Sequence, residues 1–138
     1  MKSPGNATGY HERVLAHFAK PVHAGDLQQR YPVEVRGEAA EPGGGCQVKL
    51  SAGVSGQVFR EVRHRVFGCP HLIAAAEEWC RRSEGRPVTA APRFERAELM
   101  SLLRVPVEKA GRILLLEDAW LALCRHLDSE DLRSAQKR

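Results

Sequence analysis

An apolar–polar alternation on both sides of Ser55-Gly56 predicts a β-hairpin, and this hairpin restricts the folds open to the chain. Before the turn, apolar and polar side chains alternate over residues 47–54, the period of a strand with one buried face. After the turn, residues 58–67 return as the second strand, on which three valines share a face with His64. The hairpin therefore gives the chain an antiparallel sheet with one apolar face.

A helix is expected directly after the hairpin, at the junction Phe67-Gly68-Cys69-Pro70. Proline is tolerated at a first helical position because its missing N–H would have no partner there. This helix is predicted to run to about Ser83 and to end before Gly85. One apolar stripe follows it at helical spacing: Leu72, Ala75, Ala76, Trp79 and Cys80.

The remaining pattern places further helices and a strand around the hairpin. We expect a short helix at 10–20, an edge strand at 31–37, and helices at 93–103 and 107–127. The last helix carries an apolar core face: Ile113, Leu116, Trp120, Leu123 and Leu127. The order of elements predicts an α+β fold, a small antiparallel sheet of about three strands with helices packed on it.

The length of 138 residues suits one domain. We expect it to span residues 10–127, between a flexible N-terminus at 1–9 and a charged, fraying tail at 128–138.

Composition excludes several functional classes. Hydrophobic residues make up 43% of the chain, which excludes global disorder. The 21 Lys and Arg exceed the 17 Asp and Glu by four, a surplus too small to indicate nucleic-acid binding. The longest apolar run, residues 113–116, falls far short of the ~20 residues that cross a bilayer. The N-terminus lacks a signal peptide's apolar centre, so we expect a cytoplasmic protein that does not engage membranes. Recognisable catalytic motifs are missing, so we expect no enzyme and assign no catalytic residue.

Four cysteines are the residues with the most chemical potential. In a reducing compartment they are expected to be free thiols, and no C-x2-C pair indicates a zinc finger. Cys46 follows a glycine-rich loop, and Cys69 starts a helix, where the helix dipole favours a thiolate. Both are candidates for binding a soft metal or sulfur. Cys80 and Cys124 lie on apolar helix faces and are expected to pack in the core.

Three motifs in order resemble those of the IscU/NifU-type iron–sulfur cluster assembly scaffolds. The first is Tyr10-x-x-x-Val14-x-x-His17-Phe18-x-x-Pro21-x-x-x-Gly25. The second is the strand-to-helix cysteine in Phe67-Gly68-Cys69-Pro70-His71-Leu72-Ile73-Ala74, and the third is Leu116-Glu117-Asp118-Ala119. Together they cover nearly the whole predicted domain, and the family fold they imply is again α+β.

The resemblance implies a site, a cargo and partners. In that family three cysteines, with an aspartate near the first, hold a nascent [2Fe–2S] cluster, and a cysteine desulfurase supplies sulfur. Cys69 matches the second cysteine. Cys46 matches the aspartate without a gap, or the first cysteine after a two-residue deletion. The family's His-Cys pair falls on Gly111 and Arg112, so the third thiolate is replaced by a guanidinium.

Several alternatives stay open from the sequence. Cys46 and Cys69 are the candidate ligands for iron, a [2Fe–2S] cluster or zinc, with His71 as a further candidate and a homodimer as one way to complete the site. Arg112 could balance two thiolates or take up an anion. The chaperone-recognition segment is altered at residues 105–109.

Three functions fit these residues: a divergent cluster scaffold, a paralogue that keeps the fold and a docking or regulatory role without a cluster, and a binding module with a basic strand face.

Overall fold

A computed structural model describes residues 11–90 and 93–136 of the chain. Over those residues the chain forms helices and strands in the following order: α1 (Glu12–Ala19), β1 (Val33–Ala40), β2 (Gln47–Ser55), β3 (Val58–Phe67), α2 (Pro70–Ser83), the 3₁₀ turn η2 (Val88–Ala90), α3 (Arg96–Leu103), the 3₁₀ turn η3 (Val107–Lys109) and α4 (Ala110–Gln136). No helix in this described part is long and apolar enough to cross a bilayer.

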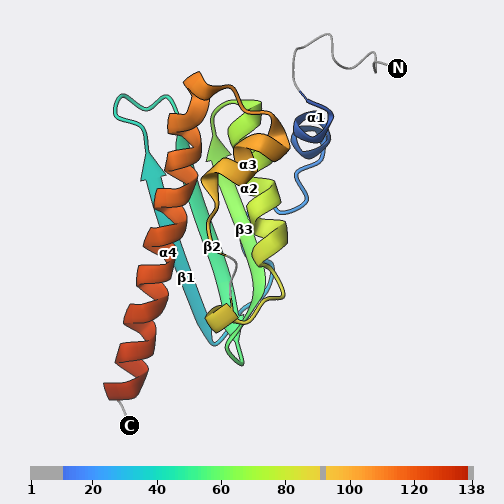
Figure 1. Cartoon of the computed structure of the whole chain (residues 1–138). Coiled ribbons are helices and arrows are strands. Elements are labelled where there is room, and N and C mark those ends of the chain that lie inside the picture. The colour runs from blue at the N-terminus through green and yellow to red at the C-terminus, as the bar shows by residue number, and fades with distance from the viewer. Residues whose placement is uncertain (1–10, 91–92, 137–138) are drawn as a thin grey trace.

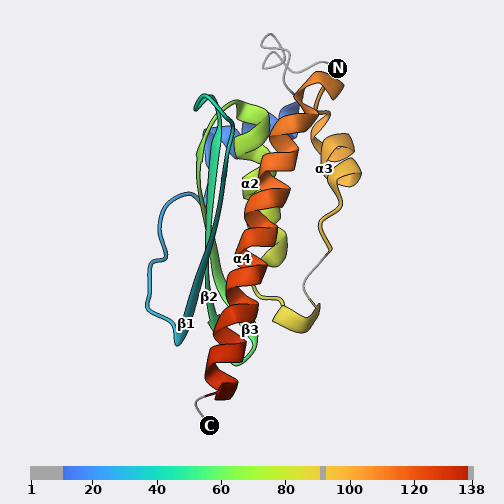
Figure 2. The same cartoon turned by 90° about the vertical axis from the view of Figure 1, so that its left-hand side faces the viewer.

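The strands form one antiparallel sheet in the order β1-β2-β3, and the helices lie on one of its faces (Figure 1). Figure 2 views the sheet from its edge, with α2, α3 and α4 on one side and the segment between α1 and β1 on the other. The predicted α+β fold with three strands is therefore confirmed, including β1 at an edge.

The core lies between the helices and the sheet, as the periodic patterns predicted. All five residues of the predicted stripe on α2 are buried, and so are the five on the core face of α4. The aromatic rings of Trp79, Trp120 and Phe59 pack against one another, with centroids 5.4 Å apart for the two tryptophans and 5.5 Å for Phe59 and Trp120. These contacts join α2, α4 and β3 into one hydrophobic unit.

Helix α4 approaches β1 most closely at Gly37. A Cβ atom at this position would collide with the backbone oxygen of Ala119 and the backbone nitrogen of Leu123. Only glycine lets the helix lie this close to the strand. This approach fixes the position of α4 across the sheet, and with it the position of the residues at the start of α4.

Both edges of the sheet form hydrogen bonds with segments that are not strands, several on β3 and one on β1. On β1, the backbone N–H of Arg36 donates to Nδ1 of His126 on α4, at 3.0 Å. On β3, the backbone N–H of His64 donates to the carbonyl oxygen of His23, at 3.0 Å, and residues 85–88 pair with the first residues of the strand. Several backbone groups that an edge strand usually leaves open are thus satisfied on β3, and the N–H of Arg36 is satisfied on β1.

A buried carboxylate, Glu77 on α2, anchors the segment that follows α1. Its side chain is 1% exposed. It accepts hydrogen bonds from the backbone N–H of His23 at 2.9 Å, from His23 Nδ1 at 2.6 Å and from His64 Nε2 at 3.1 Å. Burial raises the pKa of Glu77, but these hydrogen bonds outweigh it and hold the pKa at about 2. The charged carboxylate therefore joins three segments of the chain.

Two more carboxylates fasten the same N-terminal segment. Glu78 accepts from His17 on α1 at 3.0 Å and from Arg82 at 3.0 Å. Glu61 on β3 accepts from the hydroxyl of Tyr31 at 2.8 Å. Ion pairs and hydrogen bonds to α2 and β3 thus hold much of the chain from α1 to β1.

The structure differs from the sequence predictions at several boundaries. Helix α4 continues to Gln136 and does not end at Leu127. The helix expected from residue 93 begins at Arg96, and β1 extends to Ala40. The two 3₁₀ turns were not predicted. The expected flexible N-terminus at 1–9 lies outside the described residues.

Replacing Gly37 with alanine is expected to destabilise the fold. The added methyl group must push α4 away from β1, and overpacking of this kind costs about 1–3 kcal/mol. Urea denaturation followed by circular dichroism measures the change. Gly111→Ala serves as the control, because its Cβ meets no atom and alanine favours a helix. Equal stability of Gly37→Ala and the wild type would contradict the close approach.

The charge on Glu77 is expected to make stability depend on pH. Its folded pKa of about 2 lies below the ordinary value of 4.5, so its contribution is complete above about pH 4.5 and is lost as the pH falls toward 2. The shift corresponds to about 3 kcal/mol. Glu77→Gln should lower the free energy of unfolding at pH 7 and flatten its dependence on pH in that window. Glu98→Gln, at an exposed carboxylate, is the control, and an unchanged slope in Glu77→Gln would refute the assignment.

Candidate functional site

The two predicted site cysteines meet at one end of the sheet. Cys46 directly precedes β2, and Cys69 lies between β3 and α2, where it is the N-cap residue of the helix. The antiparallel register pairs the start of β2 with the end of β3 and so brings the two positions together. A Cβ atom built at Gly68 would lie 3.3 Å from Sγ of Cys46, so this sulfur rests against the backbone beside Cys69.

Arg112, from the first turns of α4, lies near both sulfur atoms. Its guanidinium interacts with the thiols of both Cys46 and Cys69. The negative charge that develops on Cys69 raises the pKa of Arg112, so the guanidinium keeps its positive charge. The motif alignment puts Arg112 at the place of the family's third cysteine. In the structure, too, its cationic side chain lies near both thiols.

A carboxylate, Glu41, reaches the site from the loop before Cys46. Gly43 and Gly44 adopt positive φ angles of 93° and 80°, which let the loop turn back on itself. The backbone N–H of Glu41 donates to the carbonyl oxygen of Cys46 at 2.9 Å, and its carboxylate accepts from the Cys46 thiol. The sequence reasoning missed Glu41, although a glutamate before Pro-Gly-Gly-Gly indicates a turn that folds onto the next strand.

The surroundings of Cys46 favour its protonated form. Burial raises the pKa of the Cys46 thiol, and the carboxylate of Glu41 raises it further. Arg112 acts in the opposite direction and offsets part of the rise. Cys46 is 4% exposed, whereas Cys69 is partly exposed. Cys69 is therefore the thiol that a reagent or partner reaches first.

His71, a further predicted candidate ligand, is 4% exposed in the first turn of α2. Burial lowers the pKa of its imidazole, and the positive charges of Lys109 and Arg112 lower it further. The ring is thus neutral and close to two cations. His71 therefore adds a neutral imidazole near the site, and no negative charge.

Within the described part of the chain, no three or more His, Cys, Asp or Glu side chains converge closely enough to hold a metal ion. An open zinc site takes three protein ligands. Zinc, which the sequence left open, therefore lacks a complete ligand set here. What the geometry offers is a pair of thiols beside a guanidinium.

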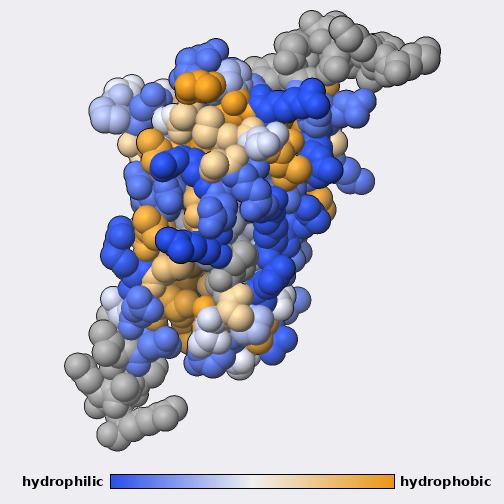
Figure 3. Space-filling model, in the orientation of Figure 1, coloured by the Kyte–Doolittle hydropathy of each residue, from blue (hydrophilic) through white to orange (hydrophobic). Residues whose placement is uncertain are grey.

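Exposed apolar side chains border the same end of the molecule. Phe67 at the end of β3 is 67% exposed, Val107 in η3 is 83% exposed and Leu114 on α4 is 41% exposed. Figure 3 shows hydrophobic residues among polar ones at the upper end of this face, and others lower down on it. An apolar border next to polar reactive groups is typical of protein contact sites.

The other predicted residues lie away from the site. Cys80 is fully buried in α2, and burial raises its pKa well above the ordinary value, which confirms its packing role. Cys124 is only partly buried, although it packs against the core. His64 is 2% exposed and bonded to Glu77, so it does not belong to the cysteine site.

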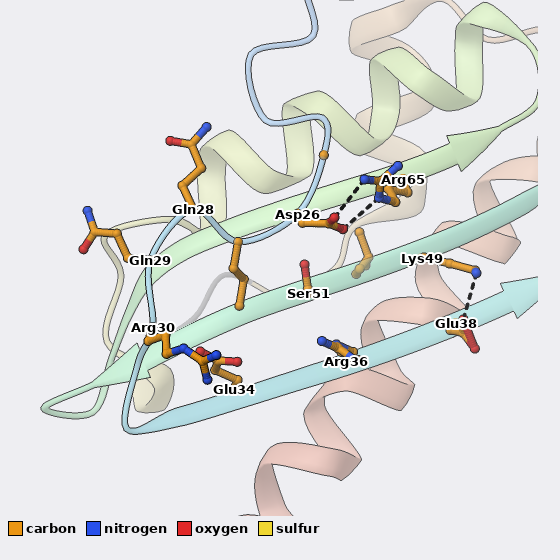
Figure 4. Close-up of a pocket in the computed structure, with 13 residues that line it drawn as sticks. Asp26, Gln28, Gln29, Arg30, Glu34, Arg36, Glu38, Lys49, Ser51 and Arg65 are labelled. Carbon is orange, nitrogen blue, oxygen red and sulfur yellow. Dashed lines mark hydrogen bonds and ion pairs between the residues drawn. The ribbon is translucent and has the colours of Figure 1, made fainter.

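A separate groove lies on the face of the sheet that carries no helix (Figure 4). Its cavity volume is about 790 Å³, and charged side chains of both signs line it. Asp26 forms a two-pronged ion pair with Arg65 there, with both distances 2.8 Å, and Lys49 pairs with Glu38 at 3.6 Å. No cysteine lines this groove, so it is distinct from the thiol site.

Comparison with known proteins places these observations in a wider context. The family model for the NifU-like N-terminal domain matches residues 9–126. The bifunctional protein NifU/MnmA of Rubrobacter xylanophilus is 33% identical over 99 residues, which cover 71% of this chain and 20% of that protein. Iron-sulfur cluster assembly protein 1 of Oryza sativa subsp. japonica is 29% identical over 139 aligned positions, 96% of this chain and 79% of that protein.

A solved structure agrees with the fold. The N-terminal part of a nitrogen-fixing NifU-like protein from Brucella abortus superimposes with a TM-score of 0.64 at 16% sequence identity. The superposition covers 86% of this chain and 94% of that one. At this level of identity the likeness concerns the arrangement of helices and strands.

Removing the Glu41 carboxylate is expected to make Cys46 more reactive. Without that acceptor and its negative charge, the Cys46 pKa falls and more thiolate is present at a given pH. The rate of alkylation by iodoacetamide at Cys46, followed by peptide mass spectrometry, should rise about two- to tenfold in Glu41→Gln. Glu38→Gln, at an exposed carboxylate on β1, is the control. A slower or unchanged rate in Glu41→Gln would refute the contact.

Proposed function

The chain belongs to the NifU-like N-terminal domain family of iron–sulfur cluster assembly scaffolds, and we propose that it holds iron–sulfur cargo through Cys46 and Cys69. The observation that supports this most directly is the meeting of both thiols at one accessible end of the sheet. Thiolates are the soft ligands that iron–sulfur units prefer. A fixed pair of them gives cargo two attachment points.

The remaining ligands come from outside the chain in this proposal. A [2Fe–2S] cluster usually takes four cysteine or histidine ligands, and two thiols supply half of that number. A second copy of the chain or a protein that receives the cluster would supply the rest. Because thiolate ligands give a cluster net negative charge, the guanidinium of Arg112 offsets charge on cargo bound beside it.

The same site fits binding of an iron–sulfur unit better than catalysis. Cys46 has a carboxylate and a guanidinium beside it, and the nearby His71 is buried. Among the described residues, no observed hydrogen bond joins a histidine base to either Cys46 or Cys69 in the way that activates nucleophilic cysteines. We therefore propose that the chain is not itself an enzyme.

Partner proteins are part of the proposal. Phe67, two residues before Cys69, is exposed, and Val107 and Leu114 are exposed at and after the turn that leads into α4; exposed apolar side chains of this kind fit a protein partner such as a cysteine desulfurase. The segment 105–109, which stands where the family has its chaperone-recognition motif, exposes Val107 but buries Val105. Desulfurase and chaperone binding, and the cytoplasmic location, stay predictions.

A second candidate function rests on Arg112. Because a cation replaces the third thiolate, the chain also fits a paralogue that keeps the fold and the docking surface without holding a cluster. The two candidates differ in whether the chain holds a cluster through Cys46 and Cys69.

Anaerobic reconstitution with iron and sulfide distinguishes the two. The wild type is expected to develop the visible absorbance of a cluster, and Cys46→Ser and Cys69→Ser are expected to lose most of it. Cys124→Ser is the matched control, because Cys124 is a partly buried thiol on α4, away from the site.

A wild type that stays colourless while folded would favour the docking paralogue. Colour that persists in both Cys46→Ser and Cys69→Ser would show that the cargo binds elsewhere and would refute the proposed site.

A further inference from the structure

We propose that the groove on the helix-free face of the sheet binds a small hydroxylated molecule through a single oxyanion group, a phosphate or a carboxylate, which Arg36 receives. Neither Cys46 nor Cys69 lines this groove, and the helices lie on the other face of the sheet. The inference therefore goes beyond the cargo site and does not depend on it.

The groove has the size and shape of a small-molecule site. The outward face of the sheet forms its floor, and segment 25–30 passes over one side of it as a wall (Figure 4). Its volume of about 790 Å³ lies in the range of pockets that hold small molecules, about 300–1,000 Å³. Ser51 on β2 has a short side chain, so the space above this part of the floor stays open.

The wall is anchored at both ends, so the groove exists before a ligand arrives. At one end, the backbone N–H of Gly25 donates to the carbonyl oxygen of His64 at 2.9 Å. At the other end, the backbone N–H of Gln28 and the hydroxyl of Tyr31 donate to the carboxylate of Glu61, at 2.9 Å and 2.8 Å. A preformed site loses less conformational freedom on binding, which favours affinity.

Arg36 on β1 supplies an unpaired positive charge to the groove. The register places it opposite Ser51, which carries no charge, whereas Glu38 lies opposite Lys49 and pairs with it at 3.6 Å. Directly opposite residues are the ones whose side chains interact most closely across a sheet. Among the described residues, the guanidinium of Arg36 therefore has no carboxylate at ion-pair distance (Figure 4).

The other charges that face the groove are mostly occupied by one another. Arg65 forms the two-pronged ion pair with Asp26, and Glu34 accepts a hydrogen bond from the backbone N–H of Tyr31 at 3.0 Å. Four cations line the groove against three carboxylates, which leaves one positive charge in excess: Arg30, Arg36, Lys49 and Arg65 against Asp26, Glu34 and Glu38. A groove with this surplus attracts anions.

The lining also defines the chemistry of the ligand. A guanidinium donates two parallel hydrogen bonds to a phosphate or a carboxylate, so Arg36 fits an oxyanion. Glu34 and Glu38 lie two residues to either side of it on the same exposed face of β1. These carboxylates repel further negative charge and accept hydrogen bonds from hydroxyl groups. The ligand class is therefore a small hydroxylated molecule with one oxyanion group, and not a polyanion.

Titration of ¹⁵N-labelled protein with glycerol 3-phosphate or with gluconate, followed through backbone amide chemical shifts, tests the site. At least one probe should cause saturable shifts in segment 25–30 and in the lining residues of β1 and β2. A Kd of about 1 mM is expected, because exposed charge pairs each contribute little. The tighter probe identifies phosphate or carboxylate as the group received. Glycerol, which has no oxyanion, should cause no saturable shift.

Three variants test the role of Arg36. Arg36→Gln should weaken binding about five- to tenfold, because the two-pronged charged contact is lost. Arg13→Gln removes the same charge from α1, outside the groove, and should bind as the wild type does. Ser51→Glu should abolish binding, since it places a carboxylate directly opposite Arg36. The amide spectrum of each variant without a probe verifies that it is folded.

The proposal is overturned if neither probe causes saturable shifts at the groove, or if Arg36→Gln binds both probes as tightly as the wild type. Tighter binding of hexaglutamate than of either probe at this face would also overturn it, because the groove would then receive an acidic protein segment.

Discussion

The contact of α4 with β1 at Gly37 is the constraint on which the thiol site depends. Arg112 reaches the sulfur atoms from the start of α4, and Cys46 follows the loop at the end of β1. The distance between helix and strand at Gly37 therefore sets where the guanidinium stands relative to the thiols. Core packing along α4 holds that distance, so the backbone from which Arg112 extends is fixed relative to the sheet.

The other side of α2 is organised by charge. Glu77 and Glu78 lie on this helix at 1% exposure each, and they bind histidines from the N-terminal segment. Burying charges is costly unless each is paired, and here the hydrogen bonds are numerous enough to keep Glu77 ionised. The helix that carries Cys69 is thus held by apolar contacts on one face and by carboxylates on another.

The periodicity of the sequence predicted the regular strands and helices. It did not predict features that depend on a turn or on contacts between distant segments. The hairpin and the meeting of Cys46 with Cys69 follow from strand alternation and antiparallel pairing. Glu77 lies outside the apolar stripe of α2, so periodicity gives no signal for its burial, which comes with its hydrogen bonds to the N-terminal segment. Glu41 reaches Cys46 through a glycine turn whose path no local propensity specifies. The prediction that Arg112 belongs to the site came from aligning the chain with the family motif, because no periodic pattern in the sequence indicates it.

The hydrogen bonds along the β3 edge of the sheet limit how this protein can meet others. Both β1 and β3 have backbone groups bonded to non-strand segments, through His126 on one side and through His23 and residues 85–88 on the other. At the β3 edge these bonds leave less backbone open to another chain that would add a strand, which is a common route to uncontrolled aggregation. Recognition at this edge falls to side chains, and such contacts can be made and released without unfolding the sheet.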